Sequence, residues 1–205
     1  MMAARRGRRP GKRNTREKIL KAAQDAFSTA GFEGTSIRQI AEAAEVDAAL
    51  VHHYFGTKEE LFTASVEFPS EPASLIARIT DGPIETIGVR VAETFISTWD
   101  DPITGPRLEA LLRRALSNRQ VSKLVKEFFA VQIVRQVSPI LDGAIDRHEI
   151  PGRASLVMSQ LFGIAVARHL IKMEPIASMS RGELVAAVAP TVQRYLTGEI
   201  GSDQP

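Results

Sequence analysis

The chain has 205 residues, of which 44% are hydrophobic and 24% charged, and this composition is typical of a folded globular protein rather than a disordered one. It contains no cysteine, which excludes disulfides, cysteine-type zinc sites and thiol catalysis. The formal net charge of +2, taken alone, argues against a nucleic-acid-binding protein, but the charge is unevenly spread. Residues 1–65 carry 11 basic and 8 acidic side chains, whereas residues 66–205 carry 15 and 16.

The positive charge is densest near the N-terminus. Residues 5–13 hold six basic side chains and no acidic one, namely Arg5, Arg6, Arg8, Arg9, Lys12 and Arg13. Arginine-rich arms of this kind follow the narrow minor groove of A·T-rich DNA, although a basic tail is often simply solvated and disordered. We expect residues 1–13 to form a disordered arm that adds DNA affinity.

No segment is predicted to enter a membrane. The basic N-terminus lacks the apolar region of a signal peptide. The longest charge-free run in the apolar C-terminal part is 154–167, which is shorter than the ~18 residues of a membrane span. These observations predict a soluble, cytoplasmic protein.

Apolar residues recur at helical spacing along nearly the whole chain, which predicts an all-α fold. A first helix is expected over 15–30, with Asn14 as its cap and Glu17 completing a capping-box-like pair. A second helix should cover 36–44, a third should follow Asp47 over 48–55, and Thr57 should cap a fourth.

Two prolines, Pro69 and Pro72, indicate a domain boundary after the fourth helix. We therefore expect one domain over 14–65 and a larger helical domain over 66–205. The helices expected in the second domain cover roughly 73–80, 83–99, 105–118, 120–147, 153–173 and 181–197.

The second and third helices, joined by a three-residue turn, form a helix-turn-helix pattern. At i,i+4 spacing, Ala48 stacks with His52 and Ala49 with His53, which gives one face of small residues and imidazoles. That face should point outward, because small residues permit close approach to a DNA groove and a methyl group can contact thymine. The large apolar side chains of the helix should pack on its neighbours; they are Leu50, Val51, Tyr54 and Phe55.

Two stretches carry a resemblance to a known family: F-x-x-x-G-F-E-G-T-S-I-R-Q-I-A, residues 27–41, and A-E-V-D-A-A-L-V-H-H-Y-F-G-T-K-E-E-L-F, residues 44–62. They resemble the TetR (tetracycline-repressor-like) transcriptional regulators. The resemblance implies an N-terminal three-helix helix-turn-helix DNA-binding domain and a larger C-terminal helical domain for dimerisation and ligand binding. The family usually has glycine where this chain has Glu45, since the turn often needs a left-handed backbone that costs other residues roughly 1–2 kcal/mol.

The resemblance also implies roles for particular residues. Thr35, Ser36 and Lys58 should bind phosphates, and Arg38 should contact a guanine edge. The full set expected at DNA is Thr35, Ser36, Arg38, Ala48, Ala49, His52, His53, Tyr54 and Lys58. The alternatives are a surface arginine, packed rings and a solvated lysine.

The C-terminal domain is expected to bind a second copy and a small-molecule effector. The helix at 153–173 and the last helix should form an isologous four-helix interface, or else a monomer core, with Leu156, Gly163, Ala167, Leu184, Val188, Val192 and Tyr195. Residues that could line an effector pocket, or be plain core, are Phe95, Trp99, Leu112, Arg113, Phe128, Phe129, Ile133, Phe162 and His169.

These features favour a homodimeric repressor that leaves a pseudo-palindromic DNA operator when an effector binds. The alternative is a DNA-binding regulator or architectural protein without a small-molecule ligand. An enzyme is not expected, because glycine-rich phosphate loops, nucleophile elbows and H-E-x-x-H motifs are absent from the sequence. No cofactor or metal is expected either.

Overall fold

The computed structural model describes residues 11–200 of the chain, with side chains from residue 14 onward. The predicted arm therefore lies outside the described residues at Arg5, Arg6, Arg8 and Arg9, and the side chains of Lys12 and Arg13 lie outside them too. Every regular element that is described is helical, apart from one isolated bridge between Asp142 and Ile145.

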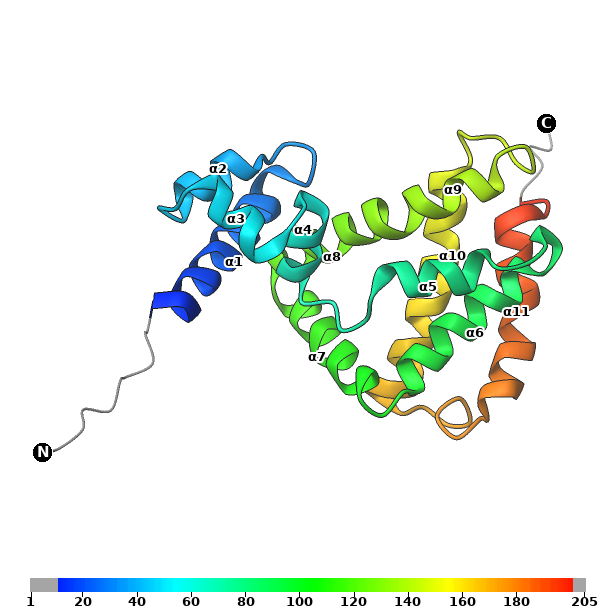
Figure 1. Ribbon diagram of the computed structural model, residues 1–205. Coiled ribbons are helices and arrows are strands. Elements are labelled where there is room, and N and C mark those ends of the chain that lie inside the picture. Colours follow the sequence, from blue (N-terminus) through cyan, green and yellow to red (C-terminus); the bar gives the residue numbers. More distant parts are fainter. Residues whose placement is uncertain (1–10, 201–205) are drawn as a thin grey trace, which may run out of the picture. The chain divides into compact units, whose positions relative to one another are not determined.

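The N-terminal unit combines two stretches of the chain, up to residue 67 and 115–128. It contains α1 (Gly11–Ala30), α2 (Ile37–Ala43), α3 (Ala48–Phe55), α4 (Lys58–Val66) and α8 (Arg119–Phe128) (Figure 1). Helix α8 packs on α1 and α4. The expected domain of 66–205 is thus interrupted, because 115–128 returns to the first unit.

Phenylalanine rings hold α8 against α1 and α4 within the N-terminal unit. The ring of Phe62 in α4 lies 4.8 Å from that of Phe27 in α1 and 6.4 Å from that of Phe128 in α8, between ring centroids. All three side chains are buried. Burial of a large side chain contributes about 1.5–3 kcal/mol, so Phe128 is a strong attachment for α8.

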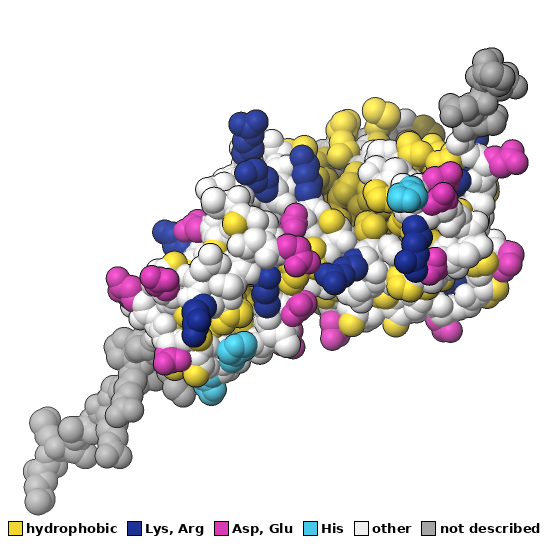
Figure 2. Space-filling view, turned by 90° about the horizontal axis from the view of Figure 1, so that it is seen from above, with side chains coloured by type: hydrophobic (Ala, Val, Ile, Leu, Met, Phe, Trp, Pro, Cys, Tyr) yellow, Lys and Arg dark blue, Asp and Glu magenta, His cyan; other side chains and the backbone are white. Residues whose placement is uncertain are grey.

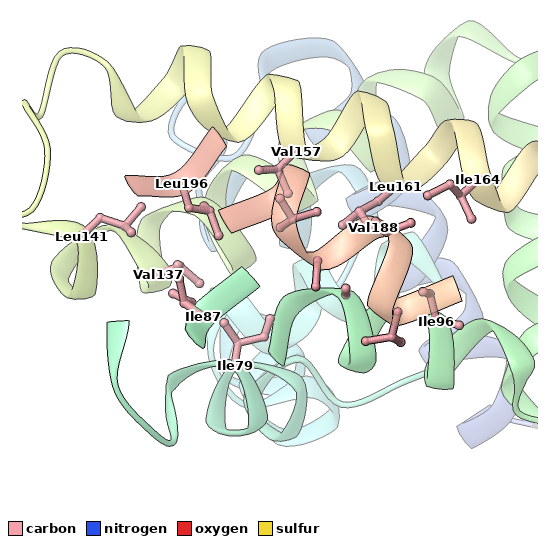
Figure 3. Close-up of a cluster of buried hydrophobic side chains, with 14 of the residues drawn as sticks. Ile79, Ile87, Ile96, Val137, Leu141, Val157, Leu161, Ile164, Val188 and Leu196 are labelled. Atoms are coloured by element: carbon pink, nitrogen blue, oxygen red, sulfur yellow. The ribbon is translucent and has the colours of Figure 1, made fainter. Parts of the chain in front are cut away.

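The C-terminal unit holds residues 68–114 and those from 129 onward. Its elements are α5 (Pro72–Thr80), a 3₁₀ turn (Ile84–Thr86), α6 (Ile87–Asp100), most of α7 (Thr104–Ser117), a π-helical turn (Phe129–Val134), α9 (Arg135–Leu141), α10 (Ile150–Ala165), a second π-helical turn (Val166–Ile171) and α11 (Arg181–Thr197). An aliphatic core gathers between α6, α10 and α11, with α5 and α9 beside it (Figure 3).

Helices α6 and α11 cross closely at Gly88. A Cβ atom there would lie 2.6 Å from the backbone N of Gln193 and 2.7 Å from the carbonyl oxygen of Ala189. The amide of Gly88 also donates a 2.7 Å hydrogen bond to the Gln193 side chain. Only a residue without a side chain fits this crossing.

Several predicted helix bounds were wrong. The first helix begins at Gly11, so Asn14 lies inside it and is not its cap. The helix expected over 120–147 is divided at Phe128 and Phe129, which pack in the cores of different units. The helix expected over 153–173 changes to a π-helical turn after Ala165 and ends at Lys172, whose φ is 58°.

The prediction for the interface of α11 was also wrong in part. Leu184, Val188 and Val192 are buried in the core of their own protomer, and Tyr195 packs against that core. The reason is that their stripe is the one that faces α6. Of the other predicted interface residues, Leu156 and Gly163 are exposed and Ala167 is half-buried.

The segment Ile150–Ile171 is long and apolar enough to cross a bilayer by length and composition alone, and 22% of its most apolar window is buried. Its two arginines are tied into the protein. Arg153 donates to the carbonyls of Tyr195 and Gly198, at 3.0 and 2.8 Å. Arg168 pairs with Asp100 at 3.0 Å. These bonds are typical of a helix that belongs to a globular core.

Candidate nucleic-acid interface

The turn between α2 and α3 adopts the left-handed backbone that the sequence comparison suggested. Glu45 has φ 55°, and the amide of Val46 behind it donates a 2.9 Å bond to the carbonyl of Ala41. Asp47 then caps α3 by accepting a 2.7 Å bond from the amide of Ala49. The turn therefore keeps its geometry without glycine, at the cost of strain at Glu45.

Helix α3 has a buried side and a solvent side. Val51 and Phe55 are buried, whereas Ala49, His52 and His53 are exposed. Ala48 and Tyr54 are half-buried, so both lie at the edges of the two sides. The arrangement presents the small-plus-imidazole face to solvent as predicted.

Leu50 departs from the prediction, which placed it on the inner side. Its side chain is 38% exposed. Each residue turns an α-helix by about 100°, so Leu50 is directed well away from the neighbouring buried Val51. Leu50 and Tyr54 were paired by their i,i+4 spacing, and their apolar character wrongly placed Leu50 on the same inner face as Val51.

Arg38 projects from α2 into solvent. Its side chain is exposed and makes no hydrogen bond or ion pair with any residue between 14 and 200. Ile40 and Ala41 on the same short helix are buried and hold it against the unit. A guanidinium that is fixed at its base and unbonded at its tip suits bidentate contact with an external acceptor.

The polar groups of Thr35 and Ser36 are used within the turn. Thr35 is 3% exposed, and its hydroxyl donates to the carbonyl of Gly31 at 2.8 Å. Ser36 forms a capping box with Gln39, whose side-chain oxygen takes the Ser36 amide at 2.8 Å. Both donors therefore have acceptors within the protein, and the phosphate contacts of Thr35 and Ser36 stay a prediction that would require these bonds to be exchanged.

The remaining predicted contacts have local partners of different kinds. Nδ1 of His52 lies 2.8 Å from the carbonyl oxygen of Gly56, so this nitrogen carries a proton and Nε2 is left for another partner. The rings of His53 and Tyr54 meet edge-on at 5.4 Å. Nζ of Lys58 lies 4.3 Å above the Phe32 ring.

Glu127 is a supporting residue that no sequence pattern indicated. Its carboxylate, from α8, accepts a 3.1 Å bond from the amide of Phe32 in the loop that leads to α2. The two residues are 95 positions apart, so only the fold brings them together. Glu127 thereby ties α8 to the loop that positions the helix-turn-helix.

Several predicted pocket residues form an aromatic cluster in the C-terminal unit. The ring of Phe95 lies 5.8 Å from Trp99 and 6.2 Å from Phe162, which in turn lies 5.2 Å from Phe129. Leu112 packs beside Trp99, and His169 lies 5.5 Å from the same indole. The cluster thus brings together six of the nine predicted residues.

The other three predicted pocket residues lie elsewhere. Phe128 belongs to the core of the N-terminal unit, so its assignment to the pocket was wrong. Ile133 packs against the aliphatic core instead, and Arg113 is exposed.

A charged group lies beside the aromatic cluster. Asp100 pairs with Arg168 at 3.0 Å, and Nε2 of His169 lies 3.5 Å from the same carboxylate. Burial lowers the pKa of His169, and the positive charge of Arg168 lowers it further, while Asp100 and Glu109 oppose the shift.

Two family models match the chain. Residues 19–64 match the model of bacterial regulatory proteins of the tetR family, and residues 85–196 match that of the tetracyclin repressor-like C-terminal domain. The chain belongs to the TetR family. The two matches together cover both described units, and the family consists of transcriptional regulators rather than enzymes.

Named relatives are similar over shorter stretches. The transcriptional repressor NicS of Pseudomonas putida is 45% identical over 103 residues, 48% of this chain and 46% of NicS. The regulatory protein RaaS of Mycobacterium tuberculosis is 50% identical over 54 residues, 26% of this chain and 25% of RaaS. The chain therefore spans about half, or less, of these relatives.

A solved structure is similar over almost the whole length. The TetR-family regulator of Streptomyces coelicolor A3 is 34% identical, with 94% of this chain and 99% of that chain covered and a TM-score of 0.44.

Proposed function

We propose that the protein is a sequence-specific transcriptional repressor that reads DNA with the N-terminal unit. The main support is the geometry of α2, the left-handed turn and α3, which exposes Ala49, His52 and His53 to solvent and leaves the Arg38 guanidinium without a partner among residues 14–200. Helix-turn-helix proteins place the second of these helices in the major groove. Repression is supported by the printed name of NicS, a transcriptional repressor.

Selection of bound fragments from genomic DNA tests this function. Purified full-length protein should enrich one pseudo-palindromic motif, whose half-sites lie about 34–36 Å apart on a dimer. A reporter gene placed behind that motif should rise when the regulator gene is deleted. If no motif were enriched among the bound fragments, sequence-specific binding would be contradicted. If expression of the reporter gene fell on deletion of the regulator gene, the protein would be an activator.

The basic residues near the N-terminus are proposed to add affinity through phosphates. Deletion of residues 1–10 removes Arg5, Arg6, Arg8 and Arg9. Each lost phosphate contact lowers the slope of log affinity against log salt by about 0.9. Titration of the operator at several salt concentrations should show a shallower slope for the shortened protein. An equal slope for both proteins would show that residues 1–10 make no phosphate contacts.

The outward sides of α10 and α11 are proposed to join two copies in the cytoplasm. The segment Ile150–Ile171 is apolar yet only 22% of its apolar window is buried in one protomer, so a second copy would cover it. The exposed residues Leu156, Gly163 and, on α11, Ala187 are consistent with this. Hydrophobic side chains are also uncovered on the C-terminal unit in Figure 2.

Sedimentation of substituted proteins tests that interface. Gly163→Arg should produce monomers, because a large charged side chain would stand in the proposed interface. The fold of one protomer should tolerate the change, since no atom lies within 4 Å of a Cβ at this position. Val192→Arg is not a suitable test, because Val192 is fully buried in the protomer core. An intact dimer of Gly163→Arg would exclude this face.

The effector is proposed to bind at the aromatic cluster of Phe95, Trp99, Phe129 and Phe162. A ligand changes DNA affinity only if it binds the DNA-bound and free states differently. Screening apolar and aromatic compounds by thermal shift should therefore find compounds that raise the melting temperature and release the operator. Compounds that stabilise the protein without releasing DNA would favour a regulator that lacks an effector.

A further inference from the structure

The solvent side of α3, which is proposed to face the DNA, lacks the side chains that usually bind base edges. The helix is Ala-Ala-Leu-Val-His-His-Tyr-Phe and holds no lysine, arginine, asparagine or glutamine. Those four residue types supply most hydrogen-bonded base readout in the major groove. Base selection by α3 must therefore rest on apolar contact, on imidazoles and on the Tyr54 hydroxyl.

Leu50 is the largest apolar side chain that α3 exposes. Steps of 100° place Ala49, Leu50 and His53 within about one third of the helix circumference, opposite the buried Val51. Ala49 ends at its β-carbon, so Leu50 extends further from the helix axis. Leu50 also lies in the N-terminal half of α3, the part of a recognition helix that reaches base edges.

One base offers an apolar group in the major groove. The C5 methyl of thymine projects there, whereas the other three bases carry no methyl group at that edge. We infer that Leu50 selects thymine in each half-site by packing on its C5 methyl group. This inference rests on the proposed function and adds the base that the helix reads.

The competing assignment is that Leu50 is a core residue of the unit. Its exposure argues against this, because the buried positions of the same helix, Val51 and Phe55, are at most 9% exposed while Leu50 is 38% exposed. The isobutyl group of Leu50 is exposed to water in the free protein, so its burial against DNA would contribute to binding affinity. Burial of one methyl group corresponds to about a fourfold gain in affinity.

The test removes the methyl group from the DNA rather than from the protein. Each thymine of the selected operator is replaced in turn by deoxyuridine, which differs only by that methyl. Affinities are measured for the unaltered full-length protein, for Leu50→Ala and for Leu116→Ala. Leu116 is the matched control, since it is 70% exposed and lies outside the helix-turn-helix.

At one thymine per half-site, deoxyuridine should weaken the unaltered protein and Leu116→Ala about fourfold, and about fifteenfold when both half-sites are changed. Leu50→Ala should bind the natural operator more weakly and show no further loss at that thymine. Equal binding of every deoxyuridine operator by the unaltered protein would overturn the inference. So would a penalty that Leu50→Ala retains. Failure to select any motif would instead contradict DNA reading itself.

Discussion

In the C-terminal unit, half-buried arginines are bonded to the protein itself, whereas the exposed Arg38 of the N-terminal unit makes no bond to residues 14–200. Arg90 donates to the carbonyls of Ile79 and Pro83 at 2.8 and 2.9 Å, and Arg168 binds Asp100 and two loop carbonyls. The same residue type therefore stabilises one unit and is exposed without a partner among residues 14–200 in the other. Hydrogen bonding, rather than net charge, shows which of these arginines support the fold.

The largest effect is expected where a half-buried arginine of the C-terminal unit is removed. Arg168→Ala leaves Asp100 and the carbonyls of Ile176 and Met179 without their donor, which should lower the free energy of unfolding by about 3 kcal/mol. Urea unfolding at fixed protein concentration measures this. Arg147→Ala is the control: its pair with Asp142 is exposed, so stability should hardly change. Equal losses of stability from the two substitutions would contradict a special stabilising role of Arg168.

The second prediction concerns the crossing of α6 and α11. Gly88→Ala places a methyl group within 2.7 Å of backbone atoms of Gln193 and Ala189, which cannot move independently of α11. We expect a loss of about 2 kcal/mol in unfolding free energy. Gly152→Ala, where no atom lies within 4 Å, should not destabilise the protein. A Gly88→Ala protein as stable as the natural one would show that the helices do not cross so closely.

In the N-terminal unit, one substitution should stabilise. Glu45→Gly relieves a left-handed backbone at φ 55° and should raise the free energy of unfolding by about 1 kcal/mol. Ala43→Gly, inside α2, should lower it by a similar amount. Thermal unfolding of both variants measures the difference in sign. Destabilisation by Glu45→Gly would mean that the turn does not strain this residue.

The smallest effect is a pH dependence of the C-terminal unit. Burial lowers the pKa of His169 in the folded state, so the unfolded chain binds the proton more readily. Stability should therefore fall as the pH drops below about 6.5, the ordinary histidine value, until it passes the folded pKa. His169→Gln should remove part of this loss between pH 7.5 and 5. An unchanged pH profile would exclude His169 as its source.

Local signals predicted the helix-turn-helix well. The caps Ser36, Asp47 and Thr57 act through the next three residues of the chain, so their helices begin close to where the sequence suggested. The family pattern indicated a left-handed turn at this position, but it did not predict that Glu45 would adopt this backbone in place of glycine. Leu50 was misplaced because apolar character was used in place of helix rotation.

Long-range contacts defeated the rest of the prediction. The return of α8 to the first unit depends on Phe128 meeting Phe62, and the support of the loop depends on Glu127 meeting Phe32. No local pattern records such partners. The inner stripe of α11 was misassigned for a related reason, since periodicity shows that one side of a helix is apolar but not which surface covers it.

The most direct test of DNA reading compares two arginines from the two units. The selected operator is titrated with the natural protein, with Arg38→Ala and with Arg107→Ala, whose arginine is also exposed but lies in the C-terminal unit. Loss of a bidentate guanine contact costs about 1–3 kcal/mol, so Arg38→Ala should bind roughly 5- to 150-fold more weakly and tolerate other bases at one position. Arg107→Ala should bind as the natural protein does. If Arg38→Ala kept the affinity and the base preference of the natural protein, a guanine contact by Arg38 would be contradicted.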